Sequence, residues 1–465
     1  MNIKDIIKDK EKEFIDVAFD IWTYAEVGYK EFKSSKRLCD CLREEGFKVN
    51  SDIPGLPTAF VAEYGSGRPI VAFWSEYDAL PGLSQKVKAS KEPSVEGAPG
   101  HGCGHNLLGT ASLAAAVAIK ELIKSGEIKG TVRLYGTPAE ELLTGKVVMV
   151  KMGLFDDVDA VIGWHPERLN MVMETPTSAV YQAKFHYKGK TAHAAVDPWN
   201  GRSALDAVEL LNISANYLRE HVPPGTTLHY STITDPLAPN IVPENATAWY
   251  FVRAQKRDVA KSVYERLVRC AKAAAEMTDT NVTVEFCGGC SDYLPNRTIE
   301  KYLHKAMESC DPISYTEEEM DFISEMTKTL PGALEASQNQ VRSDYGINVN
   351  DKLICDFFAP LSETKRKTCI TGSMDIGDVS YIVPTAQINI ACYGYAIAGH
   401  SWQVAAYAGH SVGMKGMLKA GEVMAKGAKL LFEDPEIIDR AKEELKESLG
   451  GKPYESPLPE GYKPF

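Results

Sequence analysis

The chain contains 465 residues, of which 44% are hydrophobic, and carries a formal net charge of −12 at pH 7. A single core seldom grows beyond roughly 250–300 residues, so we expect two domains. Nucleic acids and anionic membranes bind dense basic patches, and the acidic composition argues against both as partners. Small molecules are therefore the expected ligands.

The amino-terminal segment and the cysteines indicate where the protein works. Residues 1–12 form a charged amphipathic pattern without the apolar core of a signal peptide. No stretch approaches the ~20 apolar residues of a membrane helix. The ten cysteines are sparse and irregularly placed, which is typical of reduced thiols. These features predict a cytoplasmic protein that associates with no membrane.

Strands alternate with helices in the first third of the chain. Apolar residues recur at helical spacing from Phe14 to Phe47, with Gly46 as a helix stop. The alanine-rich segment from Leu107 to Ile123 predicts another helix. Short apolar runs predict buried strands at 58–64, 70–74, 131–135 and 160–164. This order predicts an α/β fold of three layers with a mainly parallel sheet.

The pattern changes at residue 179 and changes back near residue 291. Strands are predicted at 179–187, 227–234, 246–253 and 281–286, and helices at 204–220 and 259–276. This order resembles an α+β two-layer sandwich. We therefore predict a discontinuous catalytic domain, residues 1–178 and 291–465, and an inserted domain, residues 179–290.

The α/β pattern resumes beyond residue 295. A strand is predicted at 387–392 and a final helix at 412–432. The polar segment 316–351 allows no assignment. The tail from Gly450, rich in proline, glycine and charge, is expected at the surface.

The densest chemical motif is His101-Gly102-Cys103-Gly104-His105, directly ahead of the helix at 107–123. Glycines lack a Cβ and permit tight turns, so Cys103 and His105 can point at one spot at a helix N-terminus. Thiolate and imidazole are both good ligands for transition metals. The alternative is a glycine-rich turn with an incidental cysteine.

Three further motifs follow buried strands. Glu140 and Glu141 lie in an irregular turn, where one carboxylate can bind a metal while the other accepts the proton of a water. His165 and His400 each follow an apolar strand, and ligands collect at the carboxyl ends of strands in open α/β sheets. Taken singly, the glutamates fit a solvated loop and each histidine fits a core or rim position. Together with the cysteine motif, these side chains supply five ligands, enough for two metals.

Other segments of the chain carry a wider similarity. They are Trp22-Thr23-Tyr24-Ala25-Glu26, Glu76-Tyr77-Asp78-Ala79-Leu80, Gly201-Arg202-Ser203-Ala204-Leu205-Asp206-Ala207-Val208, Tyr293-Leu294-Pro295-Asn296-Arg297 and His400-Ser401-Trp402-Gln403. With the cysteine motif, extended to Thr110, they resemble the aminoacylase/carboxypeptidase family of dinuclear metallohydrolases. The resemblance covers nearly the whole chain.

The resemblance implies a reaction and the residues that perform it. Two divalent cations, manganese or zinc, would cooperate with Glu140 as general base to cleave the amide bond of an N-acyl amino acid. The foremost substrate is p-aminobenzoyl-glutamate, and a dipeptide or another N-acyl amino acid is the alternative. The implied metal ligands are Cys103, His105, Glu141, His165 and His400.

The resemblance also makes the inserted domain a lid that carries the dimer contacts. Its His193 would reach the active site of the partner subunit and stabilise the oxyanion. Asn240 and Arg253 would hold the substrate, with Arg253 as a fork for the α-carboxylate. The partner is either a second copy of the chain or a homologous A subunit.

Two departures from the family concern the substrate. Leu142 and Leu143 stand where the relatives have small glycines, which makes that wall of the site narrower and more apolar. His410 stands where the relatives have another residue type, and we expect it at the surface. Neither departure affects the predicted reaction.

Three other functions are compatible with parts of the sequence. A cysteine-nucleophile hydrolase would use Cys103, but this does not explain the glutamates and histidines. A redox or zinc module would use Cys287 and Cys290, although a single C-x-x-C is more simply two separate thiols. A binding protein of the same fold would keep the architecture without catalysis.

Overall fold

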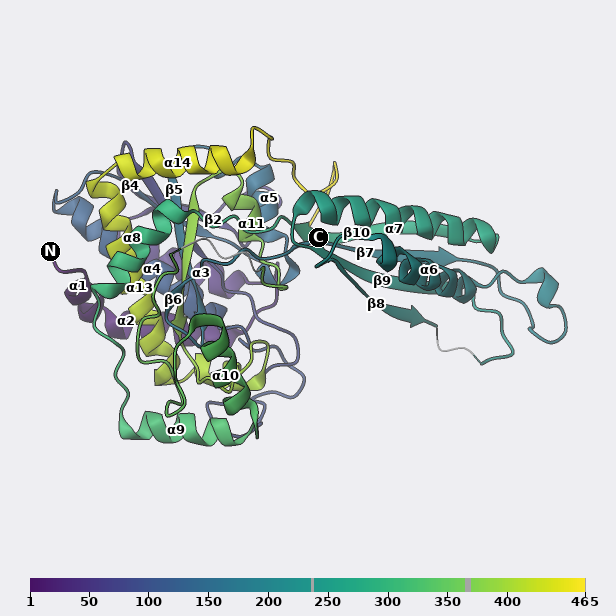
Figure 1. Cartoon of the computed structure of the whole chain (residues 1–465), viewed down its shortest axis with the longest axis horizontal. Coiled ribbons are helices and arrows are strands. Elements are labelled where there is room, and N and C mark those ends of the chain that lie inside the picture. Colours follow the sequence, from purple (N-terminus) through teal and green to yellow (C-terminus); the bar gives the residue numbers. More distant parts are fainter. Residues whose placement is uncertain (236–237, 364–368, 465) are drawn as a thin grey trace.

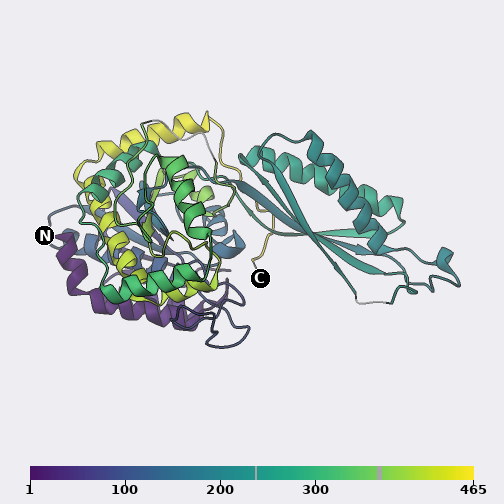
Figure 2. The same cartoon turned by 60° about the horizontal axis from the view of Figure 1, so that its bottom comes forward.

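The computed structural model describes residues 1–235, 238–363 and 369–464. A rounded body contains the amino terminus, and an elongated second body projects from it to one side (Figure 1). The same separation is visible after a turn of 60° (Figure 2). The two bodies meet at only a narrow junction.

A seven-stranded sheet forms the centre of the larger body, in the order β1-β2-β4-β3-β5-β11-β6. The four strands β3, β4, β5 and β11 run parallel, whereas β1, β2 and β6 are antiparallel to their neighbours. Four consecutive parallel strands place their carboxyl ends along one edge of the sheet. The strands are β1 (Lys48–Asn50), β2 (Phe60–Ser66), β3 (Ile70–Ser75), β4 (Gly130–Gly136), β5 (Ala160–Glu167), β6 (Met171–Val172) and β11 (Thr385–Ala391).

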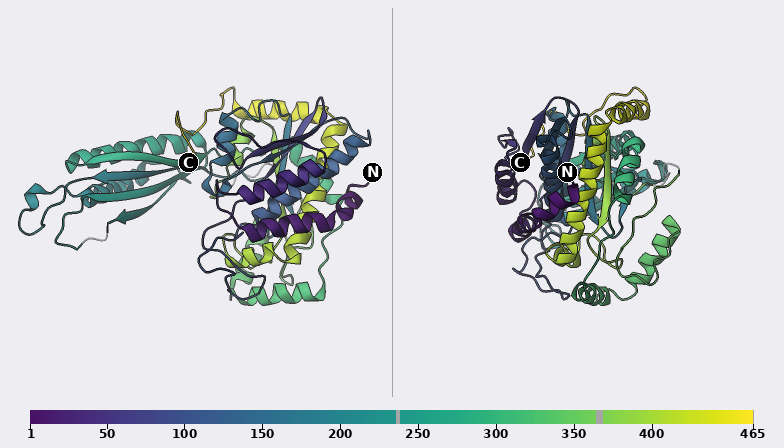
Figure 3. Two further views of the ribbon diagram at one scale, coloured as in Figure 1. Left: turned by 180° about the vertical axis from the view of Figure 1, so that it is seen from behind. Right: turned by 90° about the vertical axis from the view of Figure 1, so that its left-hand side faces the viewer.

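Helices cover this sheet. The two longest, α4 (His105–Lys124) and α13 (Ser411–Glu433), pack against each other and against the central strands. Figure 3 shows α13 beside β11, with further helices around them. The other helices of this body are α1 (Ile3–Asp9), α2 (Glu11–Tyr24), α3 (Phe32–Glu44), η1 (Glu140–Leu142), α5 (Gly145–Lys151), α8 (Arg297–Glu308), α9 (Glu317–Lys328), α10 (Ala333–Tyr345), α11 (Ile376–Ser380), α12 (Trp402–Ala408) and α14 (Glu436–Leu449).

Helix α4 corrects one expectation from the sequence. By length and composition alone it is apolar enough to cross a membrane, although no such segment was expected. In the structure 89% of its most apolar window is buried inside the protein. Its apolar character is therefore that of a core helix, which the sheet and α13 surround.

The projecting body contains a four-stranded antiparallel sheet in the order β10-β7-β9-β8. Its core lies between this sheet and two long helices, with Phe185, Leu211 and Leu267 fully buried. The elements are β7 (Ala179–Lys188), η2 (Pro198–Asn200), α6 (Ala204–Leu218), η3 (Arg219–His221), β8 (Thr227–Thr234), β9 (Asn245–Ala254), α7 (Arg257–Met277) and β10 (Asn281–Cys290). The predicted α/β class with a mainly parallel sheet and a second α+β layer structure is confirmed. We call this body the lid.

Three elements differ from the sequence expectation. The helical pattern from Phe14 to Phe47 is two helices, because Ala25 adopts a left-handed conformation (φ 43°) and ends α2. The unassigned segment 316–351 contains α9 and α10, and α9 begins with a capping box between Thr316 and Glu319. The helix at 412–432 is not the last one, since α14 follows it.

The carboxy-terminal tail joins the two bodies and is not simply a surface segment. Leu458 is buried together with Leu143 and Val147 of the larger body and with Val180 of the lid. The ring of Tyr462 packs edge-on against Phe286 of β10. This contact fixes the base of the lid next to the turn that carries the paired glutamates.

Candidate active site and metal centre

The site residues come from the carboxyl edge of the parallel strands. Glu76 and Asp78 follow β3, the paired glutamates follow β4, His165 lies near the end of β5, and His400 follows β11. Because these strands are parallel neighbours, the segments after them converge on one edge of the sheet. The motif that carries Cys103 and His105 meets them there, at the start of α4.

Glycines allow the two ligand-bearing loops to touch. Gly104 has a left-handed conformation (φ 80°) and turns the chain into α4 at His105. A Cβ on Gly102 would lie 2.3 Å from Leu83 Cδ1 and 3.3 Å from the carbonyl oxygen of Ser401. The backbone N–H of His400 donates to the carbonyl of Gly102 at 2.9 Å. The loop of His400 is therefore held directly on the loop of Cys103.

The structure brings all five predicted ligands together. Cys103 Sγ lies 3.4 Å from His165 Nε2, and His400 Nε2 lies 3.5 Å from Glu141 Oε2. Among the described residues, three triplets have all their donor atoms within 4.8 Å of one another, and two of them contain the thiol of Cys103. These two are Cys103, His105 and His165, and Cys103, Glu141 and His400.

Buried polar atoms in this cluster indicate that it fits cations. His105 Nε2 and Glu141 Oε1 are buried and have no hydrogen-bond partner in the described structure. Such atoms are costly unless something satisfies them. Burial also raises the pKa of Glu141 to about 7 and raises that of the Cys103 thiol further still. A cation beside these groups would favour their charged, ligating forms.

The raised thiol pKa also bears on the cysteine-nucleophile alternative. A reactive cysteine needs a lowered pKa, whereas burial acts on Cys103 in the opposite direction. His165 Nε2 lies 3.4 Å from the thiol, and burial, together with the neighbouring His105, lowers the pKa of that imidazole. The arrangement resembles a set of ligands more than a nucleophile with its base.

Asp78 is a site residue that the sequence analysis did not assign. Its Oδ1 accepts from His105 Nδ1 at 2.8 Å, and its Oδ2 accepts the backbone N–H of Glu141 at 2.8 Å. Burial alone would raise the pKa of Asp78, but His105, the backbone N–H of Glu141 and Lys146 together lower it. Ligating histidines commonly donate the hydrogen of their second ring nitrogen to a carboxylate. This rule could have predicted an acidic residue next to His105.

The turn that carries the paired glutamates is strained. Ala139 (φ 56°) and Leu143 (φ 57°) flank it in left-handed conformations that are unfavourable for residues other than glycine. The backbone N–H of Ala139 donates to Glu31 Oε1 at 2.8 Å, which helps to hold the turn. Burial, with Glu76 and Asp375 nearby, raises the pKa of Glu140 well above its usual range.

A cavity of about 370 Å³ opens in front of this cluster. The donor groups of Cys103, Glu140, Glu141, His165 and His400 lie on its wall, as does Arg253 at the end of β9 in the lid. Arg253 Nε is buried without a hydrogen-bond partner in the described structure, and burial lowers the pKa of this guanidinium. The apolar part of the wall is formed by Leu143, Met173, Phe251, Ile370 and Met374.

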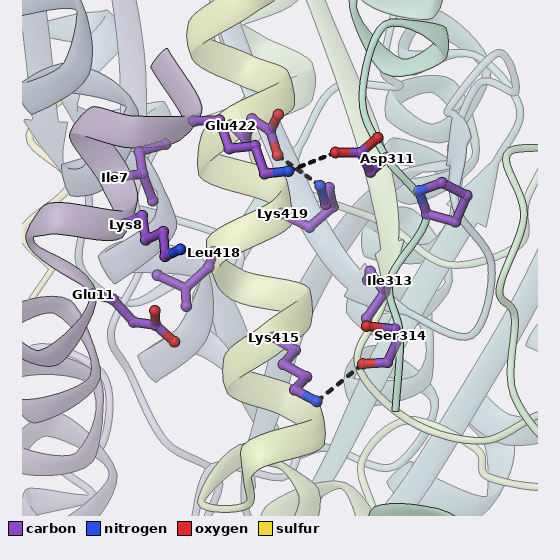
Figure 4. A pocket seen from close by; sticks show the side chains of 12 residues that line it. Ile7, Lys8, Glu11, Asp311, Ile313, Ser314, Lys415, Leu418, Lys419 and Glu422 are labelled. Atoms are coloured by element: carbon purple, nitrogen blue, oxygen red, sulfur yellow. Dashed lines mark hydrogen bonds and ion pairs between the residues drawn. The ribbon is translucent and has the colours of Figure 1, made fainter. Parts of the chain in front are cut away.

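A second cavity, of about 350 Å³, lies far from these residues between α1, α13 and residues 311–314 (Figure 4). Its charged side chains neutralise one another. Lys4 pairs with Asp311, Lys419 pairs with Glu422 at 2.6 Å, and Lys415 donates to the carbonyl of Ser314 at 2.9 Å. We therefore assign the chemistry to the cavity under the lid.

Two predicted site residues do not enter this cavity. His193 and Asn240 lie in the loops at the free end of the lid, where the N–H of Ala194 donates to the carbonyl of Asn240 at 2.9 Å. Both side chains are exposed. These loops follow β7 and precede β9, whose opposite ends join the larger body.

The remaining motifs have ordinary structural environments. Cys287 and Cys290 lie on β10 as free thiols, the second of them buried. His410 caps α13, because its Nδ1 accepts the N–H of Val412, and its ring stacks on Phe322 at 3.8 Å. It is half-buried and not simply a surface residue.

Comparison with known proteins agrees with this geometry. The model of "Peptidase family M20/M25/M40" matches residues 72–462. The chain is 37% identical to the B subunit of p-aminobenzoyl-glutamate hydrolase from Escherichia coli K12, over 99% of this chain and 98% of that protein. It is 28% identical to the Xaa-Arg dipeptidase of Mus musculus, over 95% and 93% of the two chains.

Comparison with solved structures points to the same family. The structure of the YXEP protein of Bacillus subtilis, described as a dinuclear metal-binding peptidase of the M20 family, superposes with a TM-score of 0.59. The match covers 92% of this chain and 99% of that one at 17% sequence identity. The resemblance inferred from the motifs is confirmed. The chain belongs to peptidase family M20/M25/M40, and it is a metal-dependent hydrolase of amide bonds.

Proposed function

We propose that this hydrolase cleaves p-aminobenzoyl-glutamate into p-aminobenzoate and glutamate. The 37% identity to the Escherichia coli hydrolase of that name supports the substrate. The observation that carries the proposal is the placement of Arg253, a half-buried arginine in the same cavity as the ligand cluster, whose Nε is buried without a hydrogen-bond partner among the described residues. A guanidinium in this setting is suited to bind a substrate carboxylate.

The apolar wall supports an aromatic acyl group. Leu143, Phe251 and Met374 face the cavity beside the polar cluster, so a flat apolar ring can be buried there while the carboxylate reaches Arg253. The side chain of Leu143 adds to this wall. A dipeptide or another N-acyl amino acid is the alternative substrate within the same reaction class.

The residues for two divalent cations are Cys103, His105, Glu141, His165 and His400. Cations bound there would polarise the amide carbonyl and acidify an attacking water. Thiolate and imidazole donors suit zinc, and the mixed donor set also accepts manganese. We propose manganese or zinc as the native metal.

Glu140 is proposed as the general base. Its carboxylate lies on the cavity wall and not beneath it, and its Oε2 is 3.9 Å from His105 Nε2. From this position it can accept the proton of the attacking water and return it to the leaving nitrogen. Glu141 shares a triplet with Cys103 and His400, whereas Glu140 shares one with Glu76 and His105. We propose that Glu141 serves as the ligand and Glu140 as the base.

A partner subunit completes the site in our proposal. Strand β8 is an edge of the lid sheet, and its residues from His229 onward are exposed. Ile233 of β8 and Tyr217 of α6 are large apolar side chains with 52% and 71% exposure. An unpaired edge beside exposed apolar groups is suited to pairing with another chain. A second copy would bring its own His193 and Asn240 to this cavity, and a homologous A subunit would bring the corresponding residues of its lid.

A panel of N-acyl amino acids, assayed with the Mn²⁺-loaded and the Zn²⁺-loaded protein, tests the proposal. We expect release of p-aminobenzoate from p-aminobenzoyl-glutamate to exceed release from the glycine and arginine analogues. A preference for arginine would support the dipeptidase alternative. No hydrolysis of any member would support the alternative of a binding protein of this fold. We place the reaction in the cytoplasm, in keeping with the free state of all ten cysteines.

A further inference from the structure

Glu76 lies directly beneath the ligand cluster. It follows β3 and is 1% exposed, and its Oε2 lies 3.4 Å from His105 Nε2. Both atoms are buried and lack a hydrogen-bond partner in the described structure. Glu76 is not on the wall of the cavity that Glu140 and Glu141 line. His105 is not on that wall either, so the contact between the two side chains lies beneath the cavity surface.

The orientation of His105 bears on this contact. Its Nδ1 faces Asp78, so the ring directs Nε2 at Glu76, and Nε2 is the nitrogen that would bind a cation. One cation between these two buried atoms would satisfy both, and neither has a hydrogen-bond partner among the described residues. Two donors on one cation, with bonds of about 2.0–2.2 Å, lie roughly 3.0–3.4 Å apart. The observed separation has this value.

The other oxygen of Glu76 is held by a buried lysine. Lys146 Nζ lies 2.7 Å from Glu76 Oε1 and also pairs with Asp375, and the lysine and both carboxylates are fully or almost fully buried. The backbone N–H of Lys146 donates to Asp375 Oδ2 at 2.8 Å. This arrangement turns one oxygen of Glu76 toward the lysine and leaves the other free to face His105.

We infer that Glu76 is a sixth protein ligand, which binds the cation held by His105 Nε2, and that Lys146 and Asp375 are the residues that position it. The inference rests on the metal centre of the proposed function and adds an oxygen donor to it. The third group of potential ligands in the structure has this composition, with Glu76, His105 and Glu140 donor atoms within 4.8 Å of one another. An oriented carboxylate with one oxygen on a cation and the other on a fixed hydrogen-bond donor is a common ligand arrangement.

Metal titration of the apo-protein tests the inference without reference to activity. We expect the parent chain to bind two Mn²⁺ ions, as measured by electron paramagnetic resonance. Glu76→Gln keeps the size of the side chain but replaces the carboxylate with a neutral amide, which is a poor metal ligand. In this variant we expect the Mn²⁺ affinity of one of the two sites to fall at least tenfold. The matched control is Glu300→Gln, since Glu300 is equally buried and also has an unpartnered carboxylate oxygen but lies on α8. The control should bind both ions as the parent does.

Two results would overturn the inference. One is the binding of two Mn²⁺ by Glu76→Gln with parental affinities, even where its activity is lost. If that variant does not fold, Glu76→Asp is the second test, because the shorter side chain keeps its charge. Parental Mn²⁺ affinities together with an unchanged visible spectrum of the Co²⁺ form would then exclude Glu76 as a ligand. Failure of the metal-loaded parent to hydrolyse any N-acyl amino acid would reject the proposed function but would leave these binding results intact.

Discussion

Asp78 joins His105 to Glu141. One carboxylate oxygen accepts from the imidazole Nδ1 and the other from the backbone N–H of Glu141, each at 2.8 Å. The carboxylate is fully buried, so water does not compete for either bond. A single residue outside the proposed ligand set thereby orients the ring of one proposed ligand and the backbone of another.

Replacement of Asp78 should weaken metal binding more than it weakens substrate binding. Asp78→Ala removes both acceptors, so His105 loses its preferred tautomer and the turn of Glu141 loses an anchor. We expect metal affinity to fall by about 10- to 100-fold. Competition with a metal chelator measures this, and excess metal should restore part of the activity. Parental resistance to the chelator would contradict the positioning role.

Arg253 should determine the requirement for a substrate carboxylate. A charged hydrogen bond contributes about 1.5–3 kcal/mol, so Arg253→Met should lower kcat/KM for p-aminobenzoyl-glutamate by roughly 10- to 100-fold. For the α-carboxamide analogue, the kcat/KM of the same variant should equal that of the parent. Arg269→Met, an exposed arginine on α7, is the control. Equal losses on both substrates would show that Arg253 is structural.

The sequence predicted the elements whose patterns are local. The buried strands and α4 are defined by their own apolar runs, and the glycines around Cys103 mark a turn whatever surrounds it. The break between α2 and α3 was missed because tertiary contacts stabilise it. The carboxylate of Glu26 accepts the N–H groups of Lys33 and Ser34 at the start of α3, and Glu31 bonds to the distant Thr58.

The same distinction applies to the site. The proposed ligands stand in short motifs, whereas the residues that orient them are recognisable only in three dimensions. Asp78 is 27 positions from His105, and Asp375 is 229 positions from Lys146. A buried lysine between two carboxylates has no local sequence signature, because each of the three residues alone is typical of an exposed surface. The strain at Leu143 (φ 57°) likewise appears only in the fold.

Mixed assemblies should reveal whether His193 acts across the lid. Loss of an oxyanion donor costs roughly 100- to 1,000-fold in turnover, and loss of a general base costs roughly 100- to 10,000-fold, so His193→Ala and Glu140→Gln should each be nearly inactive. In a heterodimer, one site would combine an intact Glu140 with an intact His193 of the partner subunit. Random exchange of equal amounts should therefore restore about a quarter of the sites. Subunit exchange confirmed by mass spectrometry without recovered activity would contradict an action in trans.

Glu300 should make the protein less stable as the pH rises. This buried carboxyl on α8 has its pKa raised to about 7 by burial, despite the nearby Arg297. The folded state therefore holds a proton that the unfolded state releases near its usual value of 4.5. Stability must fall as the pH increases from about 4.5 to about 7, by at most about 3 kcal/mol.

Glu300→Gln isolates this contribution, because the amide cannot ionise. We expect its advantage in free energy of unfolding over the parent to grow between pH 5 and pH 8, when both are unfolded in urea. Glu325→Gln, at an exposed position of α9, should show no such growth. A difference that stays constant with pH would mean that Glu300 ionises at its ordinary pKa. Since the shift arises from the removal of water around α8, that result would also place solvent next to a side chain that the structure shows as 1% exposed.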